Sequence, residues 1–319
     1  MSTLLFLQDL ALPRDACRDL LRVAGVPHDP RWAGDGGVDD AAVEILVTAD
    51  HHVGADLLDR YPCLQMISCA FTGTNEVDLG ACEQGGLEVY YVPDYSTASV
   101  AELAVGLALA VLRKVPAADR SARAGRWDQD RALAGKELRG RTVGIVGTGT
   151  IGLYAARLFG AFGCPLVGFS RSSRDAFRLL GGEYCDDLRG LLERADVISL
   201  HVPDEASTKE LLGAPEFEAL GPDGILVNTS RGPLVDEAAL LSALRRRTIL
   251  GAGLDVFHAE PLKEDDPLAR LDNVVLTPHL GFKTEEALQR LARTTLQNVG
   301  RFVRGEGKNR LLANPRRVR

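Results

Sequence analysis

The sequence predicts a two-domain α/β protein whose larger domain is built on a doubly wound parallel sheet. From residue 140 onward, short runs of apolar and β-branched residues alternate regularly with helical stretches. These runs lack a polar/apolar alternation, which is typical of strands buried on both faces by helices. Residues 1–98 repeat the same order on a smaller scale, and 319 residues correspond to about two domains at roughly 150 residues each.

The smaller domain opens the chain and is expected to receive its end as well. The expected strands are 3–7, 43–47, 64–69 and 87–92, and the expected helices are 15–23, 55–61 and 79–85. A helical run over 99–113 is expected to bridge the domains, and a last helix over 284–304 to return the chain to the first one. We therefore predict one domain from residues 1–98 and 285–319, and a second from residues 99–284.

The larger domain supplies the regular alternation. Its expected strands are 142–146, 165–170, 196–201, 224–229, 250–256 and 274–277, with helices over 150–162, 174–180, 188–195 and 237–246. Strands and helices in this order form a parallel sheet covered on both faces, and ligands of such sheets bind at the carboxyl ends of the strands.

Composition excludes several classes of protein. There are 37 Lys+Arg and 44 Asp+Glu, a net charge of −7, so nucleic acid is not an expected partner. The start of the chain lacks the basic segment of a signal peptide, and the longest apolar stretch, near 100–112, is too short to span a bilayer. The six cysteines have neither disulfide-framework nor zinc-site spacing, so we expect no metal, reduced thiols and a cytoplasmic location.

A glycine-rich loop joins the first strand of the larger domain to its first helix. It reads Gly147-Thr-Gly-Thr-Ile-Gly152, the dinucleotide-binding fingerprint in its required strand–loop–helix context. Gly147 permits the tight turn, Gly149 lets a pyrophosphate approach the backbone, and Gly152 lets helix and strand pack closely. Thr150 and Ile151 open the helix, whose N-terminus attracts phosphates. A Rossmann-type nucleotide domain is the prediction.

The next strand carries the choice of nicotinamide cofactor. It ends at Ser170 and is followed by Arg171, where an NAD-specific domain would place a carboxylate for the ribose hydroxyls. Without that carboxylate, and with an arginine able to pair with a 2′-phosphate, the sequence favours NADP(H) over NAD(H). The alternative is that Arg171 is a solvated loop residue and NAD(H) is accepted.

Three polar residues follow later strands and suit hydride transfer to a 2-oxo acid. Arg231 can hold a carboxylate in a two-point contact, and His279 can give a proton to the carbonyl oxygen. Glu260 beside the imidazole would favour its charged form. Each residue alone also has an ordinary structural interpretation.

Together these motifs resemble the D-isomer-specific 2-hydroxyacid dehydrogenases along essentially the whole chain. The segments that carry the resemblance are 70–78, 92–97, 101–102, 143–152, 201–203, 228–236, 255–262 and 277–281. The resemblance implies a discontinuous, flavodoxin-like substrate domain, a cleft that closes on the cofactor, and a homodimer formed through the nucleotide domain.

The resemblance also implies roles for individual residues. Arg231 would clamp the substrate carboxylate, His279 would be the acid/base with Glu260 as its partner, and the backbone at Thr72 and Gly73 would meet the same carboxylate. Asp255 would lie near the nicotinamide. Further cofactor contacts are expected from His201, Val202, Pro203, Thr229, Ser230 and Gly281.

Departures from the family pattern narrow the substrate. Phosphoglycerate dehydrogenases usually have arginines at the positions of Thr48 and Cys69, phosphite dehydrogenase has a lysine at Thr72, and formate dehydrogenases have glutamine at Glu260. We therefore do not expect 3-phosphoglycerate as substrate unless His51, His52 or an arginine of a partner chain replaces the missing cations. The expected substrate is a small 2-oxo acid: glyoxylate, hydroxypyruvate, pyruvate or a specialised relative. Two alternatives stay open: a nicotinamide-sensing, corepressor-like protein with vestigial activity, and another Rossmann enzyme such as a methyltransferase.

Overall fold

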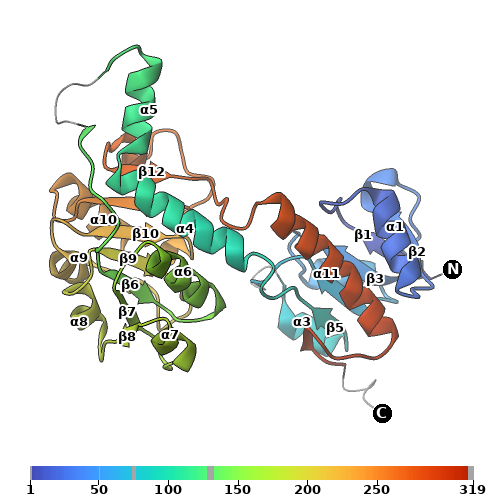
Figure 1. The fold of residues 1–319 in the computed structure, drawn as a ribbon. Coiled ribbons are helices and arrows are strands. Elements are labelled where there is room, and N and C mark those ends of the chain that lie inside the picture. Colours follow the sequence, from blue (N-terminus) through green and yellow to red (C-terminus); the bar gives the residue numbers. More distant parts are fainter. Residues whose placement is uncertain (1, 50, 74–76, 128–132, 315–319) are drawn as a thin grey trace. The chain divides into compact units, whose positions relative to one another are not determined.

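The computed structural model describes residues 2–49, 51–73, 77–127 and 133–314, and the chain divides into two compact units (Figure 1). The first consists of Met1–Ser96 and Lys283–Arg319, the second of Thr97–Phe282. These divisions fall two residues before the predicted ones at both crossings. Residues 74–76, in the segment 70–78 that carries part of the family resemblance, and residues 315–319 at the C-terminal end lie outside the described residues.

The second unit contains a seven-stranded sheet in the order β12-β11-β10-β9-β6-β7-β8, with every adjacent pair parallel. The order reverses at β6, which lies between β7 and β9, and this is the arrangement of a Rossmann sheet. The strands are β6 (Val143–Val146), β7 (Leu166–Phe169), β8 (Glu183–Tyr184), β9 (Val197–Leu200), β10 (Ile225–Asn228), β11 (Gly251–Leu254) and β12 (Val274–Leu276).

Helices cover both faces of this sheet (Figure 1). Successive strand residues point to opposite faces, so Leu226 joins one core cluster and Val227 the other. Glycine permits a close contact between strand and helix, since a Cβ on Gly253 would lie 2.8 Å from Cβ of Leu107. The helices of this unit are α4 (Thr97–Leu112), α5 (Val115–Arg123), α6 (Thr150–Ala161), α7 (Asp175–Leu179), α8 (Leu188–Leu192), α9 (Ala214–Leu220) and α10 (Glu237–Arg245). Of these, α5 projects away from the sheet and has no buried residue (Figure 1).

The first unit has a six-stranded sheet in the order β13-β5-β4-β3-β1-β2. Its five parallel strands follow the flavodoxin-like order, and β13 adds an antiparallel edge strand from the end of the chain. The elements are β1 (Thr3–Phe6), α1 (Arg14–Val23), β2 (Asp29–Trp32), β3 (Val43–Thr48), α2 (Ala55–Arg60), β4 (Met66–Cys69), α3 (Leu79–Gln84), β5 (Glu88–Tyr90), α11 (Glu285–Val303) and β13 (Arg310–Leu312).

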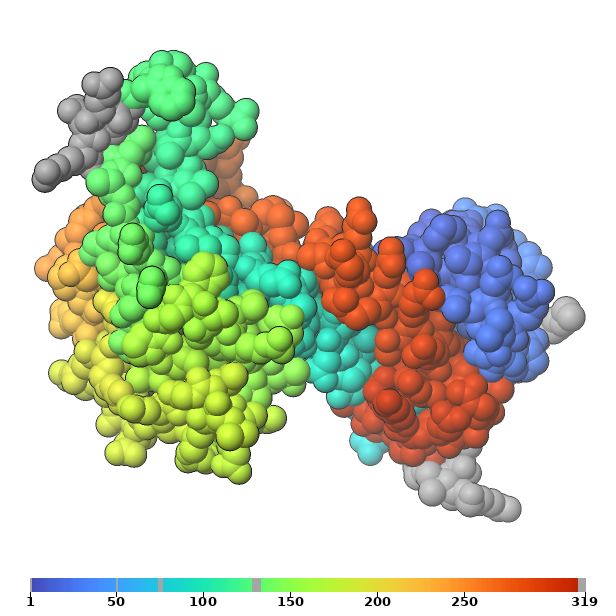
Figure 2. Space-filling model, viewed as in Figure 1, coloured from blue at the N-terminus to red at the C-terminus, as the bar shows by residue number. Residues whose placement is uncertain are grey.

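The end of the chain packs into the first unit. Leu296 and Val299 of α11 share a buried cluster with Leu21 of α1, and Figure 2 shows the red C-terminal segment beside the blue N-terminal one. The predicted fold class is confirmed: a Rossmann domain and a discontinuous flavodoxin-like domain. The sequence reading missed β2, β8, β13, α5 and α9, which are short elements at sheet edges or on the surface.

The helices and the cysteines of the described chain have two further properties. Within the described residues, no helix combines the length and apolar character needed to cross a bilayer. The six cysteines are all free thiols, and burial raises the pKa of Cys82 and of Cys164 to about 11, which keeps these two thiols protonated near neutral pH.

Candidate active site

The glycine loop, residues 147–152, follows β6 at the point where the strand order reverses. Gly147 has a left-handed φ of 94°, and a Cβ there would lie 2.5 Å from the carbonyl oxygen of His201. A Cβ on Gly152 would lie 1.9 Å from the carbonyl oxygen of Gly147, whereas one on Gly149 would meet open space. Gly147 and Gly152 are therefore required by the fold, and Gly149 leaves room for a ligand.

The first turn of α6 faces this open space. Gly149 is its N-cap and provides no side-chain hydrogen bond to the helix, so the backbone N–H groups at Thr150 and Ile151 lack a side-chain cap. Free N–H groups at a helix start bind anions. The described residues thus fit the pyrophosphate of a dinucleotide.

Two buried polar atoms that follow the adjacent strands β9 and β10 also lack hydrogen-bond partners. Within the described chain, neither Oγ1 of Thr229 nor Nδ1 of His201 has a hydrogen-bond partner. The other ring nitrogen of His201 lies 2.9 Å from Oγ of Ser199, and burial of the ring lowers the pKa of His201 to about 4. Because buried polar groups are normally paired, these two atoms fit a site that a polar ligand completes.

The predicted cofactor-selecting residues lie beyond β7. Ser170 is half-buried, and Arg171 extends into solvent, where its Nη1 lies 3.0 Å from Oε2 of Glu205. The expectation that no carboxylate stands at this position is therefore incomplete. The loop after β7 supplies none, but Glu205 reaches Arg171 from the loop after β9, 34 positions along the chain.

Arg231 follows β10 and is held by its backbone. The amide of Asn228 donates from Nδ2 to the Arg231 carbonyl over 2.8 Å and accepts from the Ser230 N–H over 3.0 Å. Ser230 Oγ also donates to the carbonyl of Leu200 on β9. The guanidinium donates one of its five N–H groups to the Ser230 carbonyl, which leaves donors for an anionic ligand. Asn228 opens the segment 228–236 that carries part of the family resemblance, but its function of anchoring this loop was not predicted.

His279 and Glu260, predicted as a pair, are in direct contact. Nδ1 of His279 lies 2.6 Å from Oε2 of Glu260, and the other carboxylate oxygen accepts from the backbone N–H of Phe257 over 2.9 Å. Both side chains are about one-third exposed, at 38% and 37%. The carboxylate is thus fixed from one side and orients the imidazole on the other, which leaves Nε2 facing away from Glu260.

Asp255 fixes the segment that carries His279. Its carboxylate, 1% exposed as a residue, accepts hydrogen bonds from Thr277 Oγ1 at 2.6 Å, Leu280 N at 2.7 Å and Gly281 N at 2.8 Å. The Asp255 carbonyl also accepts from the N–H of His279. Both carboxylate oxygens are therefore occupied within the chain, and Thr277 is a further anchoring residue that the sequence reading missed.

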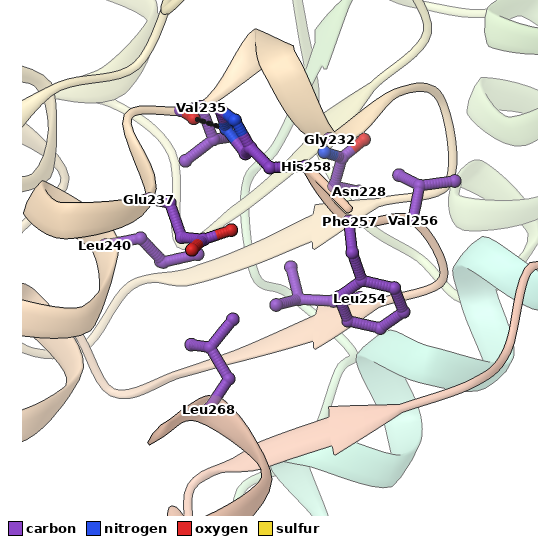
Figure 3. Close-up of a pocket in the computed structure, with 10 residues that line it drawn as sticks. All are labelled: Asn228, Gly232, Val235, Glu237, Leu240, Leu254, Val256, Phe257, His258 and Leu268. Carbon is purple, nitrogen blue, oxygen red and sulfur yellow. Dashed lines mark hydrogen bonds between the residues drawn. The ribbon is translucent and has the colours of Figure 1, made fainter. Parts of the chain in front are cut away.

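The loops after β10 and β11 are packed tightly against each other (Figure 3). A Cβ on Gly232 would lie 2.1 Å from the backbone of Phe257, and Nε2 of His258 lies 2.7 Å from the carbonyl oxygen of Val235. The largely apolar hollow beneath them has a volume of only about 20 Å³. This space is too small for a substrate. The loops that carry Arg231 and Glu260 are instead packed against each other and support each other.

Three further residues predicted to contact the cofactor lie in the loops after β9 and β12. Val202 packs against Gly147, the carbonyl of Pro203 accepts from Thr208 over 2.6 Å, and Gly281 lies against Asp255.

Thr72 and Gly73 belong to the first unit. They follow β4, and Oγ1 of Thr72 donates to the carbonyl of Val92 over 2.7 Å. Thr48 and Cys69, opposite each other at the ends of β3 and β4, are fully buried.

The fold and this arrangement define a class: a dinucleotide-binding oxidoreductase. The profile described as "D-isomer specific 2-hydroxyacid dehydrogenase, NAD binding domain" matches residues 105–281. The chain therefore belongs to the D-isomer-specific 2-hydroxyacid dehydrogenase family, which comprises oxidoreductases acting on CH–OH groups, and it has a nicotinamide-cofactor domain.

Individual relatives agree with this assignment. The D-3-phosphoglycerate dehydrogenase of Methanocaldococcus jannaschii is 38% identical over 84% of this chain, but the match spans only 51% of that protein. The glyoxylate reductase of Thermofilum pendens is 37% identical over 82% of this chain and 78% of its own length. The crystal structure of the NADPH-dependent glyoxylate/hydroxypyruvate reductase of Sinorhizobium meliloti, in complex with citrate, has a TM-score of 0.85, with 33% identity and 99% coverage of both chains.

Proposed function

We propose that this protein reduces a small 2-oxo acid to the D-2-hydroxy acid, and catalyses the reverse oxidation, with a nicotinamide cofactor. The observation that carries the proposal is the 2.6 Å contact between His279 and Glu260 at the carboxyl edge of a Rossmann sheet. When bound, the reduced nicotinamide supplies a hydride to the carbonyl carbon. The glycine loop, Thr229 and His201 would hold this cofactor.

The acid/base assignment follows from the orientation of the imidazole. Because Nδ1 is engaged with Glu260, the proton for the substrate oxygen would come from Nε2 of His279. A proton delivered as hydride arrives balances the charge on the forming alkoxide, an effect typically worth about 10²–10⁴ in rate. In the oxidation direction the same nitrogen would accept the hydroxyl proton.

Arg231 is the proposed carboxylate clamp. A guanidinium matches the two oxygens of a carboxylate, and the packed loops around Gly232 and Asn228 hold the Arg231 backbone in place. The substrate contacts assigned by the resemblance to Thr72 and Gly73 stay part of this proposal.

A small substrate without a phosphate group fits the first unit best. Thr48 and Cys69 are neutral and fully buried, so neither position offers a cation to a phosphate. Glyoxylate, hydroxypyruvate and pyruvate are therefore the proposed substrates. The relatives named glyoxylate reductase and glyoxylate/hydroxypyruvate reductase agree with this size class.

The proposal includes NADP(H) as the preferred cofactor and a homodimer formed through the nucleotide domain. The cofactor preference rests on Ser170 and Arg171 after β7. The dimer rests on the family resemblance alone, and light scattering coupled to size-exclusion chromatography tests it by giving the mass in solution.

Steady-state kinetics test the central proposal. Oxidation of NADPH and of NADH would be followed with glyoxylate, hydroxypyruvate, phosphohydroxypyruvate and pyruvate, each over a range of concentrations. We expect turnover with at least one unphosphorylated 2-oxo acid. Tight cofactor binding without turnover of any of them would contradict the proposal and favour a nicotinamide-sensing protein.

A further inference from the structure

The loop after β9 brings a carboxylate to the position where a cofactor phosphate is expected. Strands β7 and β9 flank β6, so their following loops lie on either side of the glycine loop at the carboxyl edge. Glu205 extends from one of them to Arg171 on the other, with 3.0 Å between Oε2 and Nη1. The guanidinium that could bind a 2′-phosphate thus already has an anionic partner.

The Glu205 backbone is held in a turn. Its N–H donates to Oγ1 of Thr208 over 2.9 Å, and its carbonyl accepts from the N–H groups of Thr208 and Lys209 at 2.9 and 3.0 Å. Oγ1 of Thr208 also lies 2.6 Å from the carbonyl oxygen of Pro203. These bonds fix the loop from which the carboxylate reaches Arg171.

We propose that Glu205 is a specificity-determining residue that lowers the preference for NADP(H) over NAD(H) by competing with the 2′-phosphate for Arg171. This inference rests on the proposed function, because it requires the nicotinamide cofactor to bind at the glycine loop. NADP(H) must either share the Arg171 guanidinium with Glu205 or displace Glu205 from it, and in both cases it places a phosphate of charge about −1.5 to −2 near a carboxylate. NAD(H) has no such phosphate and leaves the pair intact.

The expected size of the effect is moderate. The side chains of Arg171 and Glu205 are 76% and 41% exposed, so water and salt screen their interaction. Removal of the Glu205 charge should therefore change NADP(H) affinity by about three- to tenfold, not by orders of magnitude. The effect should also shrink as salt is added.

The test is a set of dissociation constants for NADP⁺ and NAD⁺, measured by calorimetry on the full chain at low and moderate salt. The variants are Glu205→Gln, Arg171→Ala and their combination, with Glu193→Gln as matched control. Glu193 forms a similar exposed pair with Arg189, 2.8 Å apart on the same unit. Thermal melting of each variant checks that it folds. Loss of an exposed ion pair should change the melting temperature little.

Glu205→Gln should bind NADP⁺ about three- to tenfold more tightly and NAD⁺ within twofold of the parent, whereas Glu193→Gln should change neither. With Arg171→Ala present, the gain from Glu205→Gln should shrink. Equal effects on both cofactors, or weaker NADP⁺ binding, would overturn the inference while leaving the proposed function intact. If the parent binds neither dinucleotide, both proposals fail; binding without turnover would contradict only the proposed reaction.

Discussion

His279 has a backbone φ of 52°, a left-handed conformation that non-glycine residues seldom adopt. The N–H of His279 donates hydrogen bonds to the carbonyls of Asp255 and Thr277, and these bonds maintain this conformation. Backbone strain of this kind persists only where surrounding contacts enforce it, and it is common at functional sites. The sequence identified the residue, but nothing in its local pattern predicted the conformation.

Replacement of His279 by alanine should reduce kcat by about 10²–10⁴, because the substrate oxygen loses its proton donor. The dissociation constant of the cofactor should stay within about twofold, since the glycine loop is unchanged. His258→Gln is the matched control, because glutamine can still donate to the Val235 carbonyl. Equal turnover in His279→Ala and the parent would remove His279 from its assigned role.

His201 makes stability depend on pH in a defined direction. Burial lowers its pKa from 6.5 to about 4, so between these values the unfolded chain binds more protons than the folded one. The free energy of unfolding should therefore decrease as pH falls from 6.5 toward 4, and this histidine should contribute no dependence above that window.

Urea unfolding at pH 7 and pH 4.5 measures this contribution. The loss between the two values should be about 2 kcal/mol larger in the parent than in His201→Gln, which cannot titrate. An identical loss in both proteins would show that the ring is not held neutral by burial.

At the scale of elements, the glycines of the glycine loop have different functions: Gly152 is required for packing, and Gly149 leaves room for a ligand. Gly152→Ala places a Cβ against the Gly147 carbonyl and should destabilise the protein by about 2–4 kcal/mol. Gly149→Ala meets open space at an ordinary φ of −69°, so its free energy of unfolding should stay within about 0.5–1 kcal/mol of the parent.

Gly149→Ala should nevertheless weaken dinucleotide binding by about tenfold or more, because its Cβ points to where the pyrophosphate must approach. Chemical unfolding and cofactor calorimetry on both variants provide the two readouts. Undiminished cofactor affinity in a folded Gly149→Ala protein would contradict the placement of the phosphates at the start of α6.

The segment after β12 depends on one buried carboxylate. Asp255→Asn replaces an acceptor of three hydrogen bonds with an amide that also points N–H groups at donors. We expect kcat to fall by about 10–100-fold and stability by about 1–3 kcal/mol, since His279 loses its support. Thr277→Val removes one of the three bonds and should give a smaller loss of both quantities. A larger loss in Thr277→Val would contradict this arrangement.

At the scale of the whole molecule, the alternation of strands and helices could be predicted from the sequence, whereas contacts between distant loops could not. Buried strands alternating with helices predicted both sheets. The glycine spacing from Gly147 to Gly152 predicted the nucleotide-binding loop at its observed position between β6 and α6. The edge strand β2 reads Asp29-Pro-Arg-Trp32 and contains no apolar run, and the edge strand β8 has only 2 residues, so neither shows the pattern of a buried strand. Glu205 lies 34 positions from Arg171, so only the folded sheet reveals their pairing.

At the same scale, the proposed function predicts a preference among substrates, because neither Thr48 nor Cys69 of the first unit is a cation. We expect kcat/KM for hydroxypyruvate to exceed that for phosphohydroxypyruvate by at least about tenfold, since an unpaired phosphate would lose hydration without compensation. Competition between the two substrates measures the ratio. A preference for the phosphorylated acid would contradict this part of the proposal.

The most direct test of the central claim is the configuration of the product formed from hydroxypyruvate and reduced cofactor. Transfer of hydride and proton within one fixed site predicts a single enantiomer of glycerate, formed in equal amount to the cofactor oxidised, and the family assignment makes it the D isomer. Formation of the L isomer or of a mixture of both would contradict the assignment of Arg231, Glu260 and His279 to this reaction.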